Sequence, residues 1–317
     1  MCNNNTTFNL KTILITGATG FLGSHLASAL VKEKFNVVAL KRKTSSISRC
    51  NGFGEKITWI NIEETNELKK RISEFQPEIL IHAAWSGVKA SERDNREGQE
   101  ININFLSSLL ETIKGSSVKK IIAFGSQAEY GKFEGAIDEN QPCRPDSVYG
   151  ETKLKTLQLL KEFSENHKKE WYWLRLFSVY GPGEDKSWLI PSTINNLISG
   201  SEMKLSPCEQ RYDYIYVKDF ADGIIRVVNK KENESGVFNF SSGQSISIKD
   251  IVTFLENKLA PGKGILKIGA LPYRSGQVMH MQSISDKFFR TFDFCPAHTI
   301  YKGLEETSDW YIKNNGQ

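Results

Sequence analysis

Three glycines at a spacing of three residues, Gly17, Gly20 and Gly23, follow an apolar run and precede a helical pattern. A strand, a tight turn and a helix N-terminus in this order form a cradle for the pyrophosphate of a dinucleotide. The motif therefore predicts dinucleotide binding, the alternative being a purely structural turn between strand and helix. We expect the cradle to be lined by Gly17, Thr19, Gly20, Phe21, Leu22 and Gly23.

The first half of the chain alternates strand and helix patterns, and its strands are almost continuously apolar. Such strands belong to parallel sheets that helices cover on both faces. The fold class is therefore α/β, with a Rossmann-type doubly wound parallel sheet. The expected strands are Thr12–Thr16, Asn36–Leu40, Ile57–Ile62, Glu78–His82, Lys120–Phe124 and Trp171–Phe177, and the expected helices are Leu22–Lys34, Glu64–Phe75, Gln99–Ile113 and Ser147–Glu165.

The regular alternation weakens after Gly181, where glycine and proline residues punctuate shorter elements. We expect a Rossmann domain over residues 9–177, with a returning segment near 212–240. A smaller, irregular substrate lobe would consist mainly of residues 178–211 and 241–317.

Composition limits the classes of partner. The net charge of +4 is small for 317 residues; it suits an anionic small molecule and does not indicate nucleic-acid binding. The five cysteines are scattered and show no metal-ligand spacing, so we expect free thiols, no metal and a reducing compartment. The start, Met1–Asn5, is polar, and no apolar stretch is long enough to span a bilayer. These features predict a cytoplasmic protein without membrane attachment.

The loop after the second strand carries Lys41, Arg42 and Lys43, and no acidic residue stands where that strand ends. An NAD site usually has a carboxylate there for the ribose 2′-hydroxyl, whereas cations suit the 2′-phosphate of NADP. We therefore expect NADPH/NADP⁺, the alternative being a solvated basic loop.

The pattern Tyr-x-x-x-Lys occurs twice. Tyr149 and Lys153 open a helical segment, where residues four apart are neighbours, and a nearby ammonium would lower the pKa of the tyrosine. Such a tyrosine suits general acid–base catalysis; a surface pair is the alternative. Tyr214 and Lys218 fall in a strand-like pattern that would hold the two side chains apart, so we interpret this copy as structural.

Ser126 follows a buried strand, Ile121–Phe124. A hydroxyl at the carboxyl end of a parallel strand points into the crevice where α/β sheets bind ligands, so Ser126 is a candidate to bond a substrate oxygen. A serine in an ordinary turn is the alternative.

The glycine triplet, Ser126 and the Tyr149–Lys153 pair, in this order, resemble the extended short-chain dehydrogenase/reductases. Further similarities extend over nearly the whole chain, and they occur at His82–Ala84, Asn102, Leu174–Gly183, Gln210–Asp219 and Leu271–Arg274. The branch that the chain resembles acts on nucleotide-activated sugars.

The resemblance implies a role for each matching residue. Tyr149 would be the acid/base, Lys153 would bind the nicotinamide ribose and steady the phenolate, and Ser126 would polarise the sugar oxygen. Further positions implied for the cofactor are Asn61, Ile62, Ala83, Ala84 and Asn102, and those for the substrate are Trp85, Gln127, Ser178, Arg211 and Arg274.

Departures from the family pattern narrow the activity. Sugar 4,6-dehydratases have Asp-Glu directly after the serine or threonine, and this chain has Gln127–Ala128, which argues against loss of water. Many epimerases have Asn at Ser178 and Arg at Tyr212, and those residues touch the substrate diphosphate. Because Arg211 lies one position away, on the other side of a strand, Arg274 is our main candidate for that contact.

These features together predict an NADPH-dependent reductase of a nucleotide-linked 4-keto-6-deoxy sugar, in the synthesis of activated sugars for a surface polysaccharide. The resemblance implies hydride transfer to C4, with Tyr149 as the proton donor. The enzymatic alternative is a nucleotide-sugar 4-epimerase with tightly bound NAD. The non-enzymatic alternative is an NADP-sensing binding protein. We also expect a homodimer.

Overall fold

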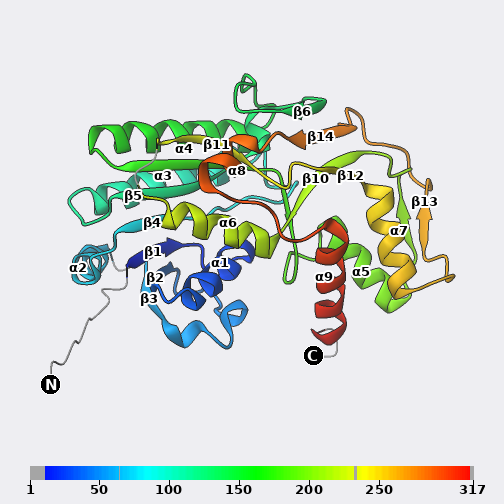
Figure 1. The fold of residues 1–317 in the computed structure, drawn as a ribbon, viewed down its shortest axis with the longest axis horizontal. Coiled ribbons are helices and arrows are strands. Elements are labelled where there is room, and N and C mark those ends of the chain that lie inside the picture. Colours follow the sequence, from blue (N-terminus) through cyan, green and yellow to red (C-terminus); the bar gives the residue numbers. More distant parts are fainter. Residues whose placement is uncertain (1–10, 64, 232–233, 315–317) are drawn as a thin grey trace.

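The computed structural model describes residues 11–63, 65–231 and 234–314. Within them, the main sheet has seven parallel strands in the order β11-β7-β5-β4-β1-β2-β3 (Figure 1). The order reverses beside β1, where β2 lies on one side and β4 on the other, so the predicted doubly wound α/β sheet is confirmed. The strands are β1 (Thr12–Thr16), β2 (Asn36–Lys41), β3 (Ile57–Asn61), β4 (Ile79–His82), β5 (Lys120–Ser126), β7 (Glu170–Leu176) and β11 (Gly236–Phe240).

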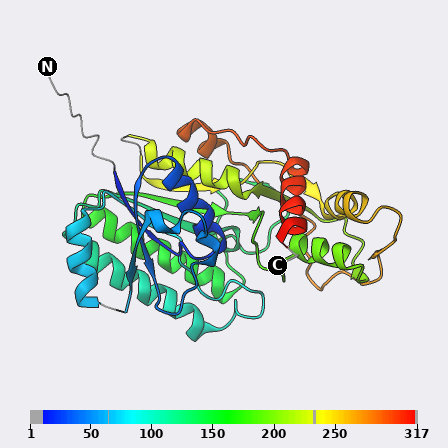
Figure 2. The ribbon, with the colours of Figure 1, turned by 90° about the horizontal axis from the view of Figure 1, so that it is seen from below.

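Helices cover both faces of this sheet, which is why its strands are apolar at successive positions (Figures 1 and 2). Ile13 and Ile15 face one core, together with residues of α1 (Phe21–Lys32) and α6 (Val217–Asn229). Leu14 faces the opposite core, formed with α2 (Thr65–Phe75), α3 (Arg96–Ile113) and α4 (Val148–Asn166).

A second sheet joins segments that are far apart in the sequence. It has the order β12-β10-β14-β6, and β8 also pairs with β10. These strands are β6 (Gly135–Ile137), β8 (Ser178–Tyr180), β10 (Arg211–Tyr216), β12 (Ser245–Ser247) and β14 (His280–Ser283). The remaining elements are β9 (Met203–Leu205), paired with β13 (Leu266–Ile268), and the helices α5 (Leu189–Ser199), α7 (Ile248–Leu259), α8 (Asp286–Phe292) and α9 (Ile300–Asn314).

The order of the strands along the chain does not separate the two sheets. β6 lies before residue 177 and pairs with β14, whereas β11 lies after residue 212 and forms the edge of the main sheet beside β7. The division into domains made from the sequence stays a prediction.

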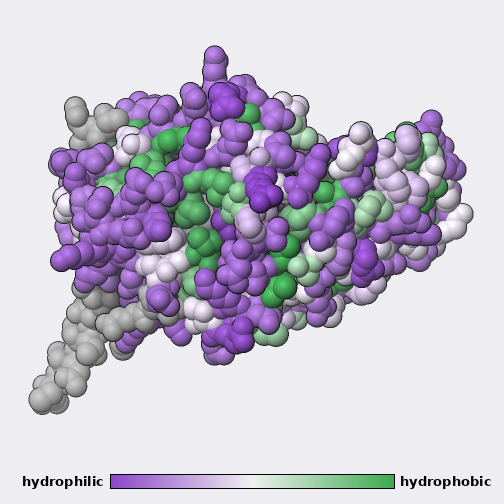
Figure 3. Space-filling model, turned by 90° about the horizontal axis from the view of Figure 1, so that it is seen from above, coloured by the Kyte–Doolittle hydropathy of each residue, from purple (hydrophilic) through white to green (hydrophobic). Residues whose placement is uncertain are grey.

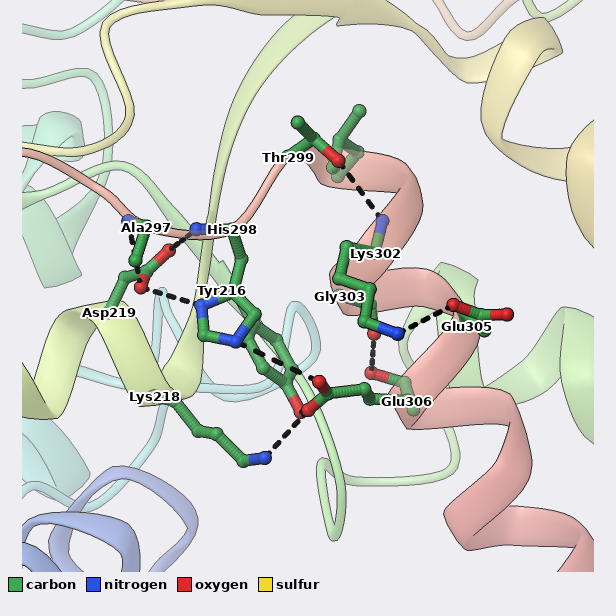
Figure 4. A network of polar contacts seen from close by, with 12 residues as sticks. Tyr216, Lys218, Asp219, Ala297, His298, Thr299, Lys302, Gly303, Glu305 and Glu306 are labelled. Atoms are coloured by element: carbon green, nitrogen blue, oxygen red, sulfur yellow. Dashed lines mark hydrogen bonds and ion pairs between the residues drawn. The ribbon is translucent and has the colours of Figure 1, made fainter.

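A polar network fixes the C-terminal helix α9 to the start of α6 (Figure 4). The buried carboxylate of Asp219 accepts hydrogen bonds from the backbone N–H groups of Ala297 and His298 and lies 2.7 Å from Nδ1 of His298. Glu306 of α9 accepts hydrogen bonds from the hydroxyl of Tyr216 and from Nζ of Lys218, at 3.1 and 2.6 Å. The last helix, α9, and the segment before it are therefore attached to α6 by charged and neutral contacts.

The predicted elements of the first half are all present, with ends that differ by up to three residues. The loop after β2, expected to be irregular, contains two short 3₁₀ helices, η1 (Ser48–Cys50) and η2 (Gly54–Lys56). Glu64, Cys2 and the segment Met1–Asn5 lie outside the described residues. No helix in the described ranges is long and apolar enough to cross a membrane. The face in Figure 3 is mainly hydrophilic, with hydrophobic residues gathered toward the middle of the view.

Candidate active site

The glycine turn has the geometry that a bound pyrophosphate requires. Gly17 has φ +73°, and a Cβ there would lie 2.6 Å from backbone atoms of Ala83 and Ala84. A Cβ on Gly23 would lie 2.0 Å from the carbonyl oxygen of Gly17, so these positions are restricted to glycine. Gly20 is the N-cap of α1; no described side chain caps this helix, and its first turn has no acidic residue. The orphan N–H groups of α1 therefore fit an anion such as a dinucleotide pyrophosphate.

The basic loop after β2 contains an acidic neighbour that the sequence did not reveal. Lys41 is half-buried and Arg42 and Lys43 are exposed. Both carboxylate oxygens of Glu63 accept from the backbone N–H of Lys43, at 3.1 and 3.2 Å. The loop itself has no acidic residue, as its sequence shows, but the turn after β3 brings the carboxylate of Glu63 to it. Asn61 and Ile62, both half-buried, stand at the end of β3 and directly after it.

The end of β4 is held against β1 by the side chain of Thr16. Its Oγ1 accepts from the N–H of Ala84 at 3.1 Å and lies 3.0 Å from Nδ1 of His82. The tautomer of His82 determines which of the two atoms donates in this second contact. Burial lowers the pKa of His82 to about 3, with a smaller contribution from Lys153, so this ring is neutral. The contacts place Ala83 and Ala84 directly over Gly17.

Trp85 and Asn102 shape the loop that follows β4. The indole N–H of Trp85 donates to Oε1 of Gln99 at 3.1 Å. The amide of Asn102 bonds the backbone N–H and carbonyl of Ser86, at 2.8 and 3.1 Å, so Asn102 holds this loop against α3. Trp85 also contacts the predicted catalytic pair: its ring lies 5.9 Å from that of Tyr149 and 3.3 Å from Nζ of Lys153.

Ser126 ends β5 and caps the short 3₁₀ helix η3 (Gln127–Glu129). Its Oγ accepts from the N–H of Ala128 at 3.2 Å, and its own N–H donates to Oε1 of Glu129 at 2.8 Å. Glu129 is fully buried and also accepts from the indole of Trp173 and from Nε of Arg175, at 2.9 and 2.7 Å. Glu129 was not singled out from the sequence, although the pattern Ser-x-x-Glu is the signature of this capping box.

The structure brings Ser126, Tyr149 and Lys153 together. Tyr149 lies in the first turn of α4 and is buried, and the Ser126 side chain is close enough to influence its pKa. Lys153, one turn further along α4, donates from Nζ to the carbonyl oxygen of Phe124 at 2.7 Å, and its Nζ lies 5.7 Å from the ring centre of Tyr149. Gln127 is half-buried beside this group.

The expected effect of Lys153 on Tyr149 is wrong. Burial raises the pKa of Tyr149, and the influences that oppose this rise are the Arg93 charge and the Ser126 side chain. Lys153 is buried beside Trp85 and its own pKa is lowered to about 7, so much of its charge is lost near neutral pH. The cation nearest in effect is therefore Arg93, which no sequence pattern had indicated.

The second Tyr-x-x-x-Lys copy has another arrangement. Tyr214 lies on β10, as expected, but α6 begins at Val217, so Lys218 is on a helix and not on the strand. Its ammonium pairs with Glu306 and lies 5.8 Å from the ring of Tyr216. This copy ties α6 to α9, in agreement with a structural role.

Three of the predicted substrate residues, Ser178, Arg211 and Arg274, lie on the second sheet and its connections. Ser178 is half-buried at the start of β8, and the exposed Arg211 donates to the carbonyl oxygen of Ser245 at 2.8 Å. Arg274 is exposed. Burial raises the pKa of Tyr212, and the charge of Arg274 opposes this rise. The Tyr212 hydroxyl donates to the carbonyl of Val278 at 2.9 Å and is contacted by the Gln277 amide.

The fold and the site define a Rossmann-type protein in which a buried serine at the end of β5 lies near a buried tyrosine and lysine of α4. The sequence profile of the NAD dependent epimerase/dehydratase family matches residues 13–240. The chain belongs to this family.

Proteins of similar length and solved structures agree with this membership. CDP-abequose synthase of Salmonella typhimurium is 27% identical over 95% of this chain and 98% of its own. Protein CapI of Staphylococcus aureus is 26% identical over 95% of this chain and 98% of its own length. The structure of UDP-glucose 4-epimerase from Thermotoga maritima with UDP-glucose superposes with a TM-score of 0.82, at 23% identity over 96% of this chain and 99% of that one. The structure of UDP-glucuronic acid 4-epimerase from Bacillus cereus, in complex with UDP-glucuronic acid and NAD, superposes with a TM-score of 0.81. It is 24% identical to this chain, over 95% of this chain and 99% of that one.

Proposed function

We propose that the protein is an NADPH-dependent reductase of a nucleotide-linked 4-keto-6-deoxy sugar, acting in the synthesis of activated sugars for a surface polysaccharide. The observation that carries this proposal is Tyr149, buried in the first turn of α4, where the Ser126 side chain at the end of β5 influences its pKa. Because burial raises its pKa, the phenol keeps its proton near neutral pH, as a proton donor in a reduction must.

Residues of the main sheet would hold the cofactor. The cradle from Gly17 to Gly23 suits the pyrophosphate, the cluster Lys41–Lys43 suits a 2′-phosphate, and Asn61 and Ile62 suit the adenine. The end of β4, with Ala83 and Ala84, lies over the cradle, while Lys153 and Asn102 would lie toward the nicotinamide ribose. When bound, the nicotinamide supplies the hydride for the sugar C4.

Ser126 and Tyr149 would complete the reduction. The Ser126 hydroxyl donates a hydrogen bond to the C4 oxygen of the sugar, and Tyr149 gives this oxygen its proton. Gln127 and Ala128 cannot exchange protons as the acidic pair of a dehydratase does, so reduction proceeds without loss of water.

The substrate diphosphate would lie against the second sheet. Arg274 offers the planar guanidinium that bonds phosphate oxygens in pairs, with Arg211 and Ser178 on the neighbouring strands. Trp85 and Gln127 would flank the sugar, because both lie beside the Ser126–Tyr149 pair. A homodimer and a cytoplasmic location stay predictions.

Glu63 favours a second candidate, a nucleotide-sugar 4-epimerase with tightly bound NAD. Its carboxylate touches the basic loop, where it would repel a 2′-phosphate and suit a ribose hydroxyl. The solved epimerase from Bacillus cereus holds NAD.

The test is incubation of the purified protein with NADPH and a panel of dTDP-, CDP- and GDP-linked 4-keto-6-deoxy sugars. We expect one NADPH consumed per sugar reduced, with deuterium transferred from labelled NADPH to C4. If the protein instead purifies with NAD and interconverts two 4-hydroxy sugars without added cofactor, the epimerase replaces the reductase.

A further inference from the structure

Arg93 lies over the predicted proton donor, in a position that none of the sequence motifs includes. It belongs to the β4–α3 loop (residues 83–95), and its guanidinium carbon is 4.9 Å from the ring centre of Tyr149. The same carbon lies 5.8 Å from the ring centre of Trp188, just before α5. One guanidinium therefore contacts both the catalytic helix and the lobe that carries the predicted substrate residues.

The position of Arg93 is fixed by its loop. Its Nε donates to the carbonyl of Val88 at 3.0 Å, and the terminal nitrogens have no hydrogen-bond partner among the described residues. The neighbouring Asp94 accepts from the N–H of Val148, the first residue of α4, at 3.1 Å. Lys89, further back in the loop, pairs with Asp185 at 3.0 Å. The loop is thus attached to both walls of the site, which holds the cation over Tyr149.

Other charged groups around Tyr149 do not replace this cation. Glu129, from η3, is an anion and disfavours the phenolate. Lys153, on α4, donates its hydrogen bond to Phe124, and its Nζ lies over the ring of Trp85. His82 is buried and neutral, so it adds no charge. Arg96 and Glu151 form an exposed pair at 3.4 Å, so their charges are screened.

We propose that Arg93 is a positioning residue that holds the ring of Tyr149 and stabilises the phenolate formed when Tyr149 gives up its proton. In the reduction, on which this role rests, the O–H bond of Tyr149 breaks and its proton forms an O–H bond at the C4 oxygen. The electron pair stays on the phenolate oxygen, which is buried and needs a counter-charge. The guanidinium, which lies over the ring, supplies it.

The first experiment needs no substrate, so it separates this proposal from the proposed reductase. The full-length protein is labelled with 3-fluorotyrosine, and the Tyr149 resonance is assigned by its loss in Tyr149→Phe. Its ¹⁹F shift is then followed through an alkaline titration in the wild type, Arg93→Gln, Arg93→Lys and Arg96→Gln. Arg96→Gln is the matched control, because it removes a cation at the start of α3, directly after this loop, that pairs with Glu151 of α4.

We expect the phenolate fraction of Tyr149 at a fixed alkaline pH to fall roughly threefold to tenfold in Arg93→Gln. Arg93→Lys keeps the charge and stays nearer to the wild type, and Arg96→Gln leaves the titration in place. If Arg93→Gln does not fold, Arg93→Met, which keeps the aliphatic contacts with both rings, takes its place. An unchanged titration in the uncharged variant, or an equal change in Arg96→Gln, overturns the proposal.

A second measurement uses the pH dependence of turnover. In Arg93→Gln the alkaline limb of kcat for sugar reduction moves to higher pH and the plateau falls, because Tyr149 becomes a weaker acid. If turnover falls but the alkaline limb of the kcat profile stays at the same pH, Arg93 has a purely structural role and the proposal is contradicted.

Discussion

The carboxylate of Glu129 lies 2.7 Å from Nε of Arg175, and the two side chains are 0% and 5% exposed. Arg175 also donates to the hydroxyl of Tyr130 at 2.9 Å, and this hydroxyl donates to Asn239 of β11 at 2.6 Å. One carboxylate oxygen of Glu129 accepts a hydrogen bond from the backbone N–H of Ser126. The buried ion pair of Glu129 and Arg175 therefore helps to position Ser126, whose hydroxyl is the candidate group of the active site.

Removing the charge of Glu129 leaves Arg175 buried without its counter-ion. We expect Glu129→Gln to lower the free energy of unfolding by about 3–5 kcal/mol, measured by urea denaturation. The control is Glu74→Gln, in an exposed pair with Lys70 at 4.0 Å, which should change stability by about 0.5 kcal/mol or less. Equal effects of the two substitutions would show that the buried pair has no special role.

Tyr149→Phe removes the hydroxyl of the predicted proton donor. Turnover should fall by roughly 10²-fold or more, while cofactor affinity stays close to that of the wild type. Tyr214→Phe is the matched control from the second Tyr-x-x-x-Lys copy and should retain proton transfer. The assignment is reversed if Tyr214→Phe loses more turnover than Tyr149→Phe.

The cofactor preference should depend on the basic loop after β2 and on the carboxylate of Glu63, which contacts this loop from the turn after β3. NADPH should bind about tenfold or more tighter than NADH, a difference of about 1.4 kcal/mol, measured by titration calorimetry. Arg42→Ala should weaken NADPH and scarcely change NADH, whereas Glu63→Gln should strengthen NADPH because it removes a nearby anion. Equal affinities of the unmodified protein for both cofactors would contradict the NADP assignment.

Glu184, in the loop after β8, should make stability depend on pH. Its Oε2 is buried with no hydrogen-bond partner in the described part of the chain, and burial raises its pKa from 4.5 to about 8. Between these values the folded protein binds a proton that the unfolded chain releases, so this residue's contribution to stability is lost as pH rises.

Glu184→Gln removes this contribution. From about pH 5 to pH 8, the variant should gain stability relative to the wild type, measured by the urea midpoint at each pH. The exposed Glu202→Gln provides the control and should follow the wild type. A constant difference between Glu184→Gln and the wild type would mean that the carboxyl titrates in its ordinary range.

Local rules were sufficient to predict the glycine turn, the parallel strands, and the positions of Ser126 at a strand end and Tyr149 in a helix. Each of these follows from the spacing of neighbouring residues. Arg93 over Tyr149, and Glu63 against Lys43, depend instead on the paths of loops between elements, which periodicity does not encode. The pKa of Tyr149 was mistaken for the same reason: burial, a property of the whole fold, outweighs the helical neighbour Lys153.

The pairing of β6 with β14 sets a limit on how this chain assembles during synthesis. A nascent chain that has reached residue 240 contains every strand of the parallel sheet, but β6 then lacks its partner, because Met281–Ser283 have not been made. The rings of Phe288 and Phe292, which contact Phe238 of the edge strand, and the Asp219 contacts with Ala297 and His298 come later still. The sheet edge that supports the active site is therefore left open until almost the whole chain has emerged from the ribosome.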